Sequence, residues 1–214
     1  DSIISQLIES PGKPGRFRVM NADGTRRQQL TTYGELPQWS PDGTQIVYNI
    51  DNHLTDLDGG VWVMNTDGTN QRQLTNDDGR NPQWSPDGTQ ITYTGYDGIA
   101  IVNADGTNQR QLTNDDGRNP QWSPDGTQIV YNIDNRLTDL DSGVWVMNAD
   151  GTKQRRLTSD DGRNPQWSPD GTQITFHNDY GDVFLINVDP PNLPQLLVGN
   201  GWDPVWSPSA LTGS

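Results

Sequence analysis

Cysteine is absent from the 214-residue chain, which excludes disulfide bridges, thiolate zinc sites and cysteine nucleophiles. Its absence leaves the redox compartment undecided, because an oxidising envelope and a reducing cytosol both suit a chain without thiols. Long apolar runs are also absent, and none approaches the roughly 18 residues that a membrane-spanning helix needs. No signal-peptide pattern opens the chain, as is also true of mature proteins. We therefore expect no cross-linked domain and no membrane insertion.

Positive charge is scarce. Lysine and arginine total 14, against 28 aspartate and glutamate residues, so the formal net charge is −14. Such a surface repels phosphate backbones and anionic lipid, and we expect no nucleic-acid partner.

An internal repeat dominates what the chain does contain. The string NPQWSPDGTQI occurs at 81–91, 119–129 and 164–174, LPQWSPDGTQI stands at 36–46, and a degenerate DPVWSPSAL stands at 203–211. The repeated tryptophans are Trp39, Trp84, Trp122, Trp167 and Trp206, at intervals of 45, 38, 45 and 39 residues. Periods of this size are typical of solenoids and propellers.

Each repeat predicts four short antiparallel strands. In the repeat at 83–113, a segment around Trp84 ends at a Ser-Pro-Asp-Gly turn, and residues 90–94 then alternate between polar and apolar. Residues 99–102 form a short apolar run rich in β-branched residues, and a polar alternating segment follows at 109–113. Four strands are the content of one propeller blade, and the sequence predicts no helix of useful length.

The two ends of the chain predict how the repeats close. Residues 1–31 supply three strands and lack the Trp-bearing first one, whereas residues 203–208 supply only that first strand. We therefore predict an all-β fold: one closed five-bladed β-propeller over residues 1–214, with one blade shared between the chain ends, which removes an open sheet edge. The predicted blades are 1–31 with 203–208, 36–75, 81–113, 119–158 and 164–198.

The repeat string NADGTNQRQLTNDDGRNPQWSPDGTQI resembles the TolB-like propeller repeat, a relative of the WD-repeat propellers whose signature is SPDG after a tryptophan. The resemblance covers nearly the whole chain. It implies a periplasmic or extracellular location and a role in protein contacts. TolB itself is described with a further N-terminal domain and six blades, so its cellular role is not transferred.

Chain direction sorts the connections onto two faces, and the variable ones share a face. They include the loops that precede each first strand. Aligned on the proline that follows, one position of these loops holds Glu35, Arg80, Arg118, Arg163 and Trp202, and Asp203 follows Trp202. We expect these six residues near the mouth of a central channel.

Two interpretations of the arginines remain. Three guanidinium groups at a channel mouth suit a carboxylate or phosphate ligand. Alternatively, each arginine pairs with the aspartate just before it in its own loop, or with one in a neighbouring loop. Glu35 and Trp202 break the symmetry, as an asymmetric ligand requires.

Two long loops, DNHLTDLDGG and DNRLTDLDSG, each carry three carboxylates. Calcium takes six to eight oxygen ligands of this kind, although the spacing is not that of an EF-hand. A solvated acidic loop is the plainer interpretation, and no other metal or cofactor is expected. The calcium candidates are Asp51, Asp56, Asp58, Asp134, Asp139 and Asp141.

Catalysis has little support in the sequence. His53 and His177 lie in different repeats, and no carboxylate pair is flanked by the apolar residues that raise a pKa for acid catalysis. We therefore expect a non-enzymatic, monomeric interaction module that binds a protein or peptide on its variable loop face. A lectin-like glycan binder with sites between blades is the alternative, and a hydrolase with carboxylates in the channel is the third.

Overall fold

The computed structural model describes residues 2–7, 16–31, 33–51, 59–134, 142–158 and 162–206. Every regular element in these ranges is a β-strand, so the all-β prediction is confirmed. The strands are β1 (Ser2–Leu7), β2 (Arg16–Asn21), β3 (Gln28–Gln29), β4 (Glu35–Trp39), β5 (Gln45–Ile50), β6 (Gly60–Asn65), β7 (Arg72–Gln73), β8 (Arg80–Trp84), β9 (Gln90–Gly95), β10 (Gly98–Asn103), β11 (Arg110–Gln111), β12 (Gly117–Trp122), β13 (Gln128–Ile133), β14 (Gly143–Asn148), β15 (Arg155–Arg156), β16 (Arg163–Trp167), β17 (Gln173–His177), β18 (Val183–Asn187) and β19 (Gln195–Val198).

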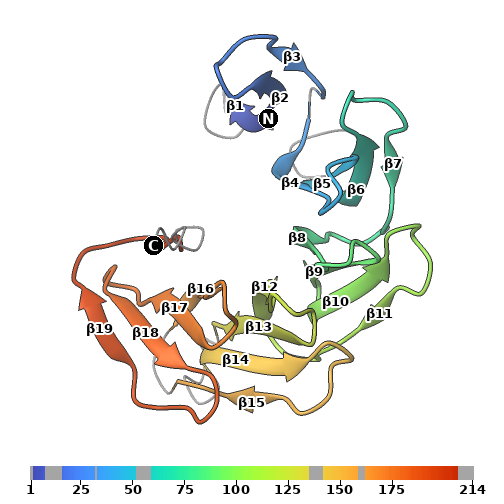
Figure 1. Cartoon of the computed structure of the whole chain (residues 1–214). Helices are drawn as coiled ribbons and strands as arrows, with labels where there is room; N and C mark the ends of the chain where they lie inside the picture. The colour runs from blue at the N-terminus through green and yellow to red at the C-terminus, as the bar shows by residue number, and fades with distance from the viewer. Residues whose placement is uncertain are drawn as a thin grey trace. The chain divides into compact units, whose positions relative to one another are not determined.

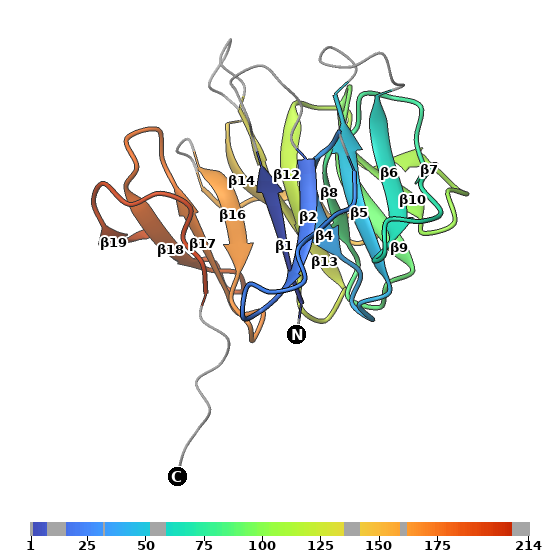
Figure 2. The same cartoon turned by 90° about the horizontal axis from the view of Figure 1, so that it is seen from above.

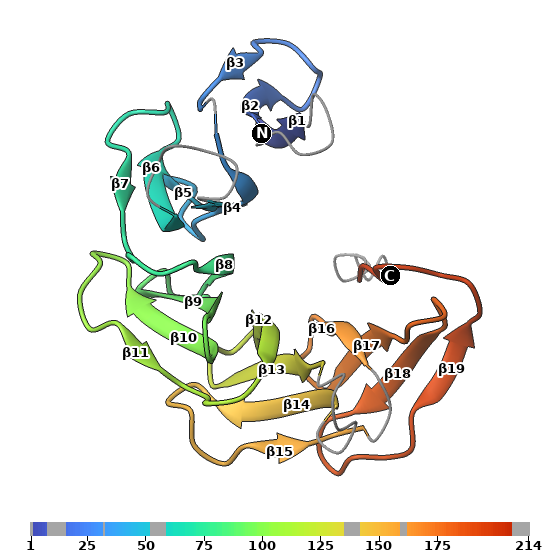
Figure 3. The same ribbon diagram turned by 180° about the vertical axis from the view of Figure 1, so that it is seen from behind.

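These strands form five sheets, each an antiparallel meander in chain order. Four sheets have four strands (β4–β7, β8–β11, β12–β15 and β16–β19), and the first, β1–β3, has three. Strands β16 to β19 lie side by side in this order in Figures 1 and 3, and Figure 2 shows β4, β5 and β6 in the same up-and-down arrangement. The prediction of four strands per repeat is therefore confirmed for the four complete repeats.

The chain divides into two compact units. The first comprises Asp1–Tyr96 and Ala100–Gln111, and the second comprises Asp97–Ile99 and Leu112–Ser214. The division falls within β10. Closure of the five sheets into one ring stays a prediction.

The repeated turn chemistry explains why the first two strands of each four-stranded sheet pair. In the turn after β8, Ser85 Oγ donates to Asp87 Oδ1 at 2.6 Å, and Asp87 Oδ1 also accepts the backbone N–H of Thr89 at 3.0 Å. Gly88 adopts φ of 71°, which a side chain would disfavour. The same bonds recur after β4, β12 and β16.

The hydrophobic core lies between successive sheets. In the first unit, Val63 of β6 packs with Trp84 of β8 and Val102 of β10. In the second, Val146 of β14 packs in the same way with Trp167 and Ile186. One sheet cannot bury its own apolar face, so each sheet depends on its neighbour.

The fourth strands are shorter than predicted. The segment 109–113 yields only the two residues of β11, because the backbone N–H groups of Leu112 and Thr113 both turn toward the carbonyl oxygen of Ile99. The ladder cannot continue past this shared acceptor.

The C-terminal strand predicted at 203–208 is only partly described. Residues 203–206 belong to none of the five sheets, and the pairing of 203–208 with β1 stays a prediction. Trp206 nevertheless behaves like a first-strand tryptophan. Its Nε1–H donates to the carbonyl oxygen of Gln166 at 3.3 Å, as that of Trp167 donates to Gln121 at 3.1 Å.

Candidate functional site

The candidate site is built from the loops that lead into the first strands. Within each unit these strands approach one another, because β4 contacts β8 in the first unit and β12 contacts β16 in the second. Residues at their starts therefore face neighbouring repeats.

A bulge fixes the side chains at this point. The register shifts between Arg80 and Gln83, and again between Arg118 and Gln121 and between Arg163 and Gln166. The residue before the proline that precedes each repeated tryptophan takes a left-handed conformation, with φ between 47° and 53°. Asparagine and aspartate tolerate this conformation best, which explains their use at four of the five positions. These residues are Leu36, Asn81, Asn119, Asn164 and Asp203.

In the second unit this geometry creates a chain of polar side chains. Asn119 Nδ2 donates to Asn164 Oδ1 at 2.9 Å, and Asn164 Nδ2 donates to Asp203 Oδ1 at 2.7 Å. Each asparagine also meets the second strand of its own sheet. Asn119 Nδ2 lies 3.0 Å from Asn132 Oδ1, and Asn164 Nδ2 lies 3.3 Å from His177 Nε2. This series of hydrogen bonds links three successive repeats and ends at the exposed carboxylate of Asp203.

His177 connects this series of hydrogen-bonded side chains to Trp202. The imidazole is buried and its Nδ1 lies 3.0 Å from the carbonyl oxygen of Asn178, while its Nε2 lies 3.6 Å from Asp203 Oδ1. The indole of Trp202 packs edge-on against the imidazole with ring centroids 5.1 Å apart. A Cβ built on Gly181 would lie 2.7 Å from this indole, so a glycine is needed there. Trp202 is still 60% exposed. We call Asn164, His177, Trp202 and Asp203 the Trp202 site.

Two of the three arginines form ion pairs. Arg80 Nη2 lies 3.1 Å from Asp51 Oδ2 in the first unit. Arg163 Nη2 lies 3.2 Å from Asp134 Oδ1, and Arg163 also pairs with Asp179. The partners Asp51 and Asp134 directly follow β5 and β13, so the pairing aspartates are not those next to the arginines in sequence.

Arg118 differs from the other two, because it pairs with no carboxylate in the described part of the chain; like Arg80, it is exposed. Glu35 in the first unit accepts a long hydrogen bond of 3.5 Å from Asn49 Nδ2. Arg118, Arg163, Trp202 and Asp203 thus all lie in the second unit, and Glu35 and Arg80 both lie in the first.

The calcium candidates are only partly described. Asp51 and Asp134 point to arginines, as above, and Asp56, Asp58, Asp139 and Asp141 lie outside the described residues. The described ranges contain no group of three or more His, Cys, Asp or Glu side chains placed to hold a metal ion.

Shifted carboxyl pKa values all move downward. The hydroxyl of Ser40 and the backbone and hydroxyl of Thr44 donate to Asp42 and hold its pKa below its usual value, and equivalent bonds lower the pKa of Asp87, Asp125 and Asp170. Burial raises the pKa of the Tyr48, Tyr93 and Tyr131 hydroxyls. A carboxyl group that acts as a general acid at neutral pH needs a raised pKa, so these turn aspartates do not suit that role.

Sequence reasoning missed His177 and the asparagines. The signal was present, since Asn-Pro recurs before three of the tryptophans, but the pair was read as part of a loop. Its role depends on the bulge, which turns the side chain toward the neighbouring repeat.

Antiparallel four-stranded repeats with a tryptophan before each Ser-Pro-Asp-Gly turn define a propeller-repeat protein. The family described as TolB beta propeller domain (PD40) matches residues 4–208. The chain therefore belongs to this family.

Solved structures of the same fold have low sequence identity to the chain. It is similar to TolB from Acinetobacter baumannii, with a TM-score of 0.70 and 18% identity over 92% of this chain and 52% of that one. An oligogalacturonate lyase in complex with manganese gives a TM-score of 0.68 and 18% identity, over 87% and 61% of the two chains. A nidogen/laminin complex gives 0.69 and 14%, over 94% and 80%. The chain thus spans about half the length of the Acinetobacter protein.

No curated protein that was compared matches the chain. Among the described residues, no helix is long and apolar enough to cross a membrane.

Proposed function

We propose that the chain is a non-enzymatic interaction module that binds a protein or peptide through the Trp202 site. One observation carries the proposal: a large aromatic side chain is held in a defined position by His177 and Gly181 and still presents most of its surface to solvent. Tryptophan and arginine are the residues most enriched at the energetic centres of protein interfaces.

The neighbouring groups suit a peptide ligand. Asp203 is fixed by Asn164 and keeps 72% of its side chain exposed, and Arg118 is an exposed cation. The Asp203 carboxylate and the Trp202 indole are both held by neighbouring side chains, so they form a preorganised contact surface, and we expect the Arg118 guanidinium to add a third contact. Joint use of Arg80 with Arg118 and Arg163 around one channel stays a prediction.

Catalysis has weaker support. The fold alone does not decide between binding and catalysis, since the similar structures include a lyase and a puromycin hydrolase. The lowered carboxyl pKa values in the repeat turns suit ionised structural groups and not a general acid.

The comparisons support the choice of partner class. The nidogen/laminin structure is a complex between proteins, and its fold is that of this chain. With the family membership, this supports a protein partner and a periplasmic or extracellular location. We further propose that residues 203–208 complete the β1–β3 sheet as its first strand and close a five-bladed ring.

A glycan binder would use equal sites between all repeats. The repeats differ in this respect, because Trp84 and Trp167 are buried to 9% and 8% exposure whereas Trp39 is half-buried. This inequality favours a protein partner over repeated glycan sites.

The test is capture from cell-envelope extract on immobilised wild-type protein, eluted first with free sugars and then with salt. Trp202→Ala removes the indole. Tyr96→Ala is the control, because it removes an aromatic side chain of the first unit that is 89% exposed. We expect one captured protein that salt elutes from the immobilised wild type and from the immobilised Tyr96→Ala variant. The immobilised Trp202→Ala variant should not capture it. Release by sugar, or equal capture by Trp202→Ala, contradicts the proposal.

A further inference from the structure

A cleft opens between the first two sheets of the first unit. It has a volume of about 470 Å³. We call it the Trp39 cleft, and it is lined by Val19, Gln28, Trp39, Gly43, Thr66 and Asp67. An indole and a valine side chain supply the apolar surface, and an amide, a hydroxyl and a carboxylate supply the polar one.

The repeat provides two matched positions for comparison. On the outer strands, Val19 pairs with Gln28 in the register that joins Val63 to Arg72 and Val146 to Arg155. Gln28 therefore stands where the three following sheets carry an arginine, since Arg110 pairs with Ile101 in the same way. Two of the three, Arg72 and Arg155, show where the side chain goes.

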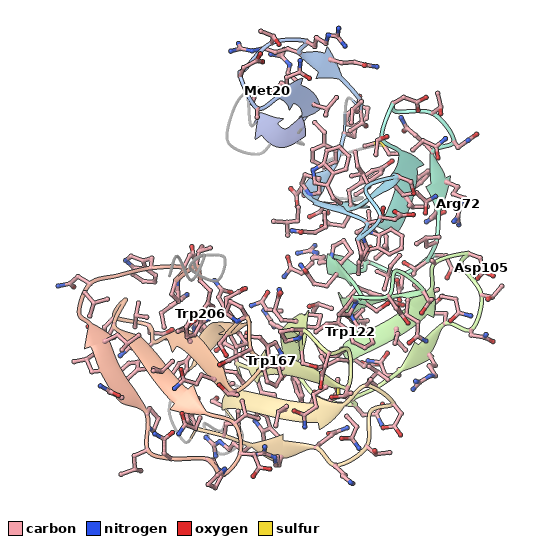
Figure 4. The ribbon with its side chains drawn as sticks, in the orientation of Figure 1. Met20, Arg72, Asp105, Trp122, Trp167 and Trp206 are labelled. Atoms are coloured by element: carbon pink, nitrogen blue, oxygen red, sulfur yellow. The ribbon has the colours of Figure 1, made fainter. Side chains whose placement is uncertain are left out.

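Those arginines cross to the next sheet. Arg72 Nη2 donates to the carbonyl oxygen of Ala104 at 2.6 Å, and Arg155 Nη2 donates to that of Val188 at 2.8 Å. Figure 4 shows Arg72 beside Asp105. Hydrogen bonds from Thr107 hold the pKa of Asp105 below its usual value, and the charge of Arg72 lowers it slightly further. The tryptophans of the same two gaps, Trp84 and Trp167, are buried.

The Trp39 cleft has the acceptors of this arrangement but not the arginine. Thr66 and Asp67 occupy the turn positions of Ala104 and Asp105. The shorter Gln28 stops at the carbonyl oxygen of Asp67, to which its Nε2 donates at 3.2 Å. Thr69 donates from its backbone and its hydroxyl to Asp67 Oδ1 and lowers the pKa of this carboxyl, so the group carries a negative charge at neutral pH.

We propose that the Trp39 cleft binds the guanidinium group of an arginine side chain from a partner peptide. The guanidinium takes the place that Arg72 and Arg155 fill between later pairs of sheets, donates to the Thr66 carbonyl and the Asp67 carboxylate, and lies against the Trp39 indole. Arginine suits this combination because its planar group stacks on aromatic rings and donates in several directions. The net charge of −14 attracts a cationic ligand. The site is separate from the Trp202 site and does not depend on it.

The test is titration of ¹⁵N-labelled protein with the peptide acetyl-Gly-Arg-Gly-amide, followed by NMR at the Trp39 indole N–H. The citrulline peptide, which has the same shape without the charge, is the ligand control. We expect saturable shifts with the arginine peptide and at least fivefold weaker binding of the citrulline peptide. Equal binding of both peptides, or binding of a neutral sugar in their place, overturns the proposal.

Three variants sharpen the test. Gln28→Arg rebuilds the neighbouring arrangement, so it should abolish peptide binding. Asp67→Asn keeps the turn and should weaken binding about fivefold. Asp105→Asn is the matched change in a gap that already holds its arginine, and it should leave binding unchanged. Undiminished binding by Asp67→Asn overturns the proposal even if Gln28→Arg does not fold.

Discussion

The repeated tryptophans are chemically equivalent but differ in burial. Trp167 is 8% exposed, and its Nε1–H donates to the Gln121 carbonyl oxygen, whereas Trp39 is half-buried beside a cleft. Trp39, Trp122 and Trp206 are all partly exposed, so the five tryptophans do not contribute equally to the core.

Trp167→Ala should therefore lower the free energy of unfolding by about 3–5 kcal/mol, through lost burial and a cavity. Trp39→Ala should lower it by about half as much, since less indole surface leaves the core. Guanidinium denaturation of the two variants and the wild type measures both losses. Equal losses of stability in the two variants would contradict this account, because they would show that the two indoles are equally well packed.

The Ser-Pro-Asp-Gly aspartates predict how stability depends on pH. Hydrogen bonds from Ser40 and Thr44 hold the pKa of Asp42 below 3.8 in the folded chain, and the other three turns repeat this. A depressed folded pKa adds stability above the unfolded pKa and loses it as pH falls through the folded value.

We expect a melting temperature that is steady above about pH 5 and falls as the pH drops below the unfolded value near 3.8. Asn at all four positions keeps the turn acceptor but removes the titration, so this variant should have a flatter profile. Melting curves between pH 2.5 and 7 test this, and an unchanged acid slope in the variant would refute it.

Among the elements, strands and turns were the most predictable part of the fold. Alternation at 90–94 and the apolar run at 99–102 gave β9 and β10, because local patterns determine which side of a strand is buried. The lengths of the outer strands were not predictable. They depend on how two N–H groups share the Ile99 carbonyl oxygen, which is a tertiary detail.

The candidate site was predicted only in part. Alignment on the proline pointed to Trp202 and Asp203, but it did not find His177. The contact between His177 and Trp202 joins residues from two strand ends, so it follows from the sheet register and not from local sequence.

The loop before each first strand requires a small residue as it enters the sheet. A Cβ built on Gly79 would lie 2.8 Å from Tyr93 Cδ2 and 2.9 Å from Val61 Cγ2, both in the core. Gly79→Ala should cost about 1–3 kcal/mol of stability through overpacking. Gly199→Ala meets only the flexible carboxylate of Asp182, at 3.3 Å, and should change stability by less than about 0.5 kcal/mol. Urea denaturation of both variants tests the difference, and equal effects would contradict it.

For the molecule as a whole, the predicted closure makes the C-terminal segment essential. Within the second unit, Asp203 and Trp206 are bonded to Asn164 and Gln166. Deleting residues 203–214 removes these bonds and the proposed closing strand, so we expect a lower melting temperature and aggregation through an open edge. Light scattering and thermal melting measure both, and a monomeric deletion variant with an unchanged melting temperature would refute closure.

The proposal that Trp202 contacts a protein partner is tested most directly by site-specific photo-crosslinking. A photoreactive phenylalanine analogue replaces Trp202 in one protein and Tyr180, which is 81% exposed, in a second. A third protein carries it at Tyr96 of the first unit as the control. In cell-envelope extract, the account predicts one discrete protein adduct at position 202, a weaker one at the adjacent position 180 and none at position 96. No adduct at 202, or equal adducts at 202 and 96, would contradict it.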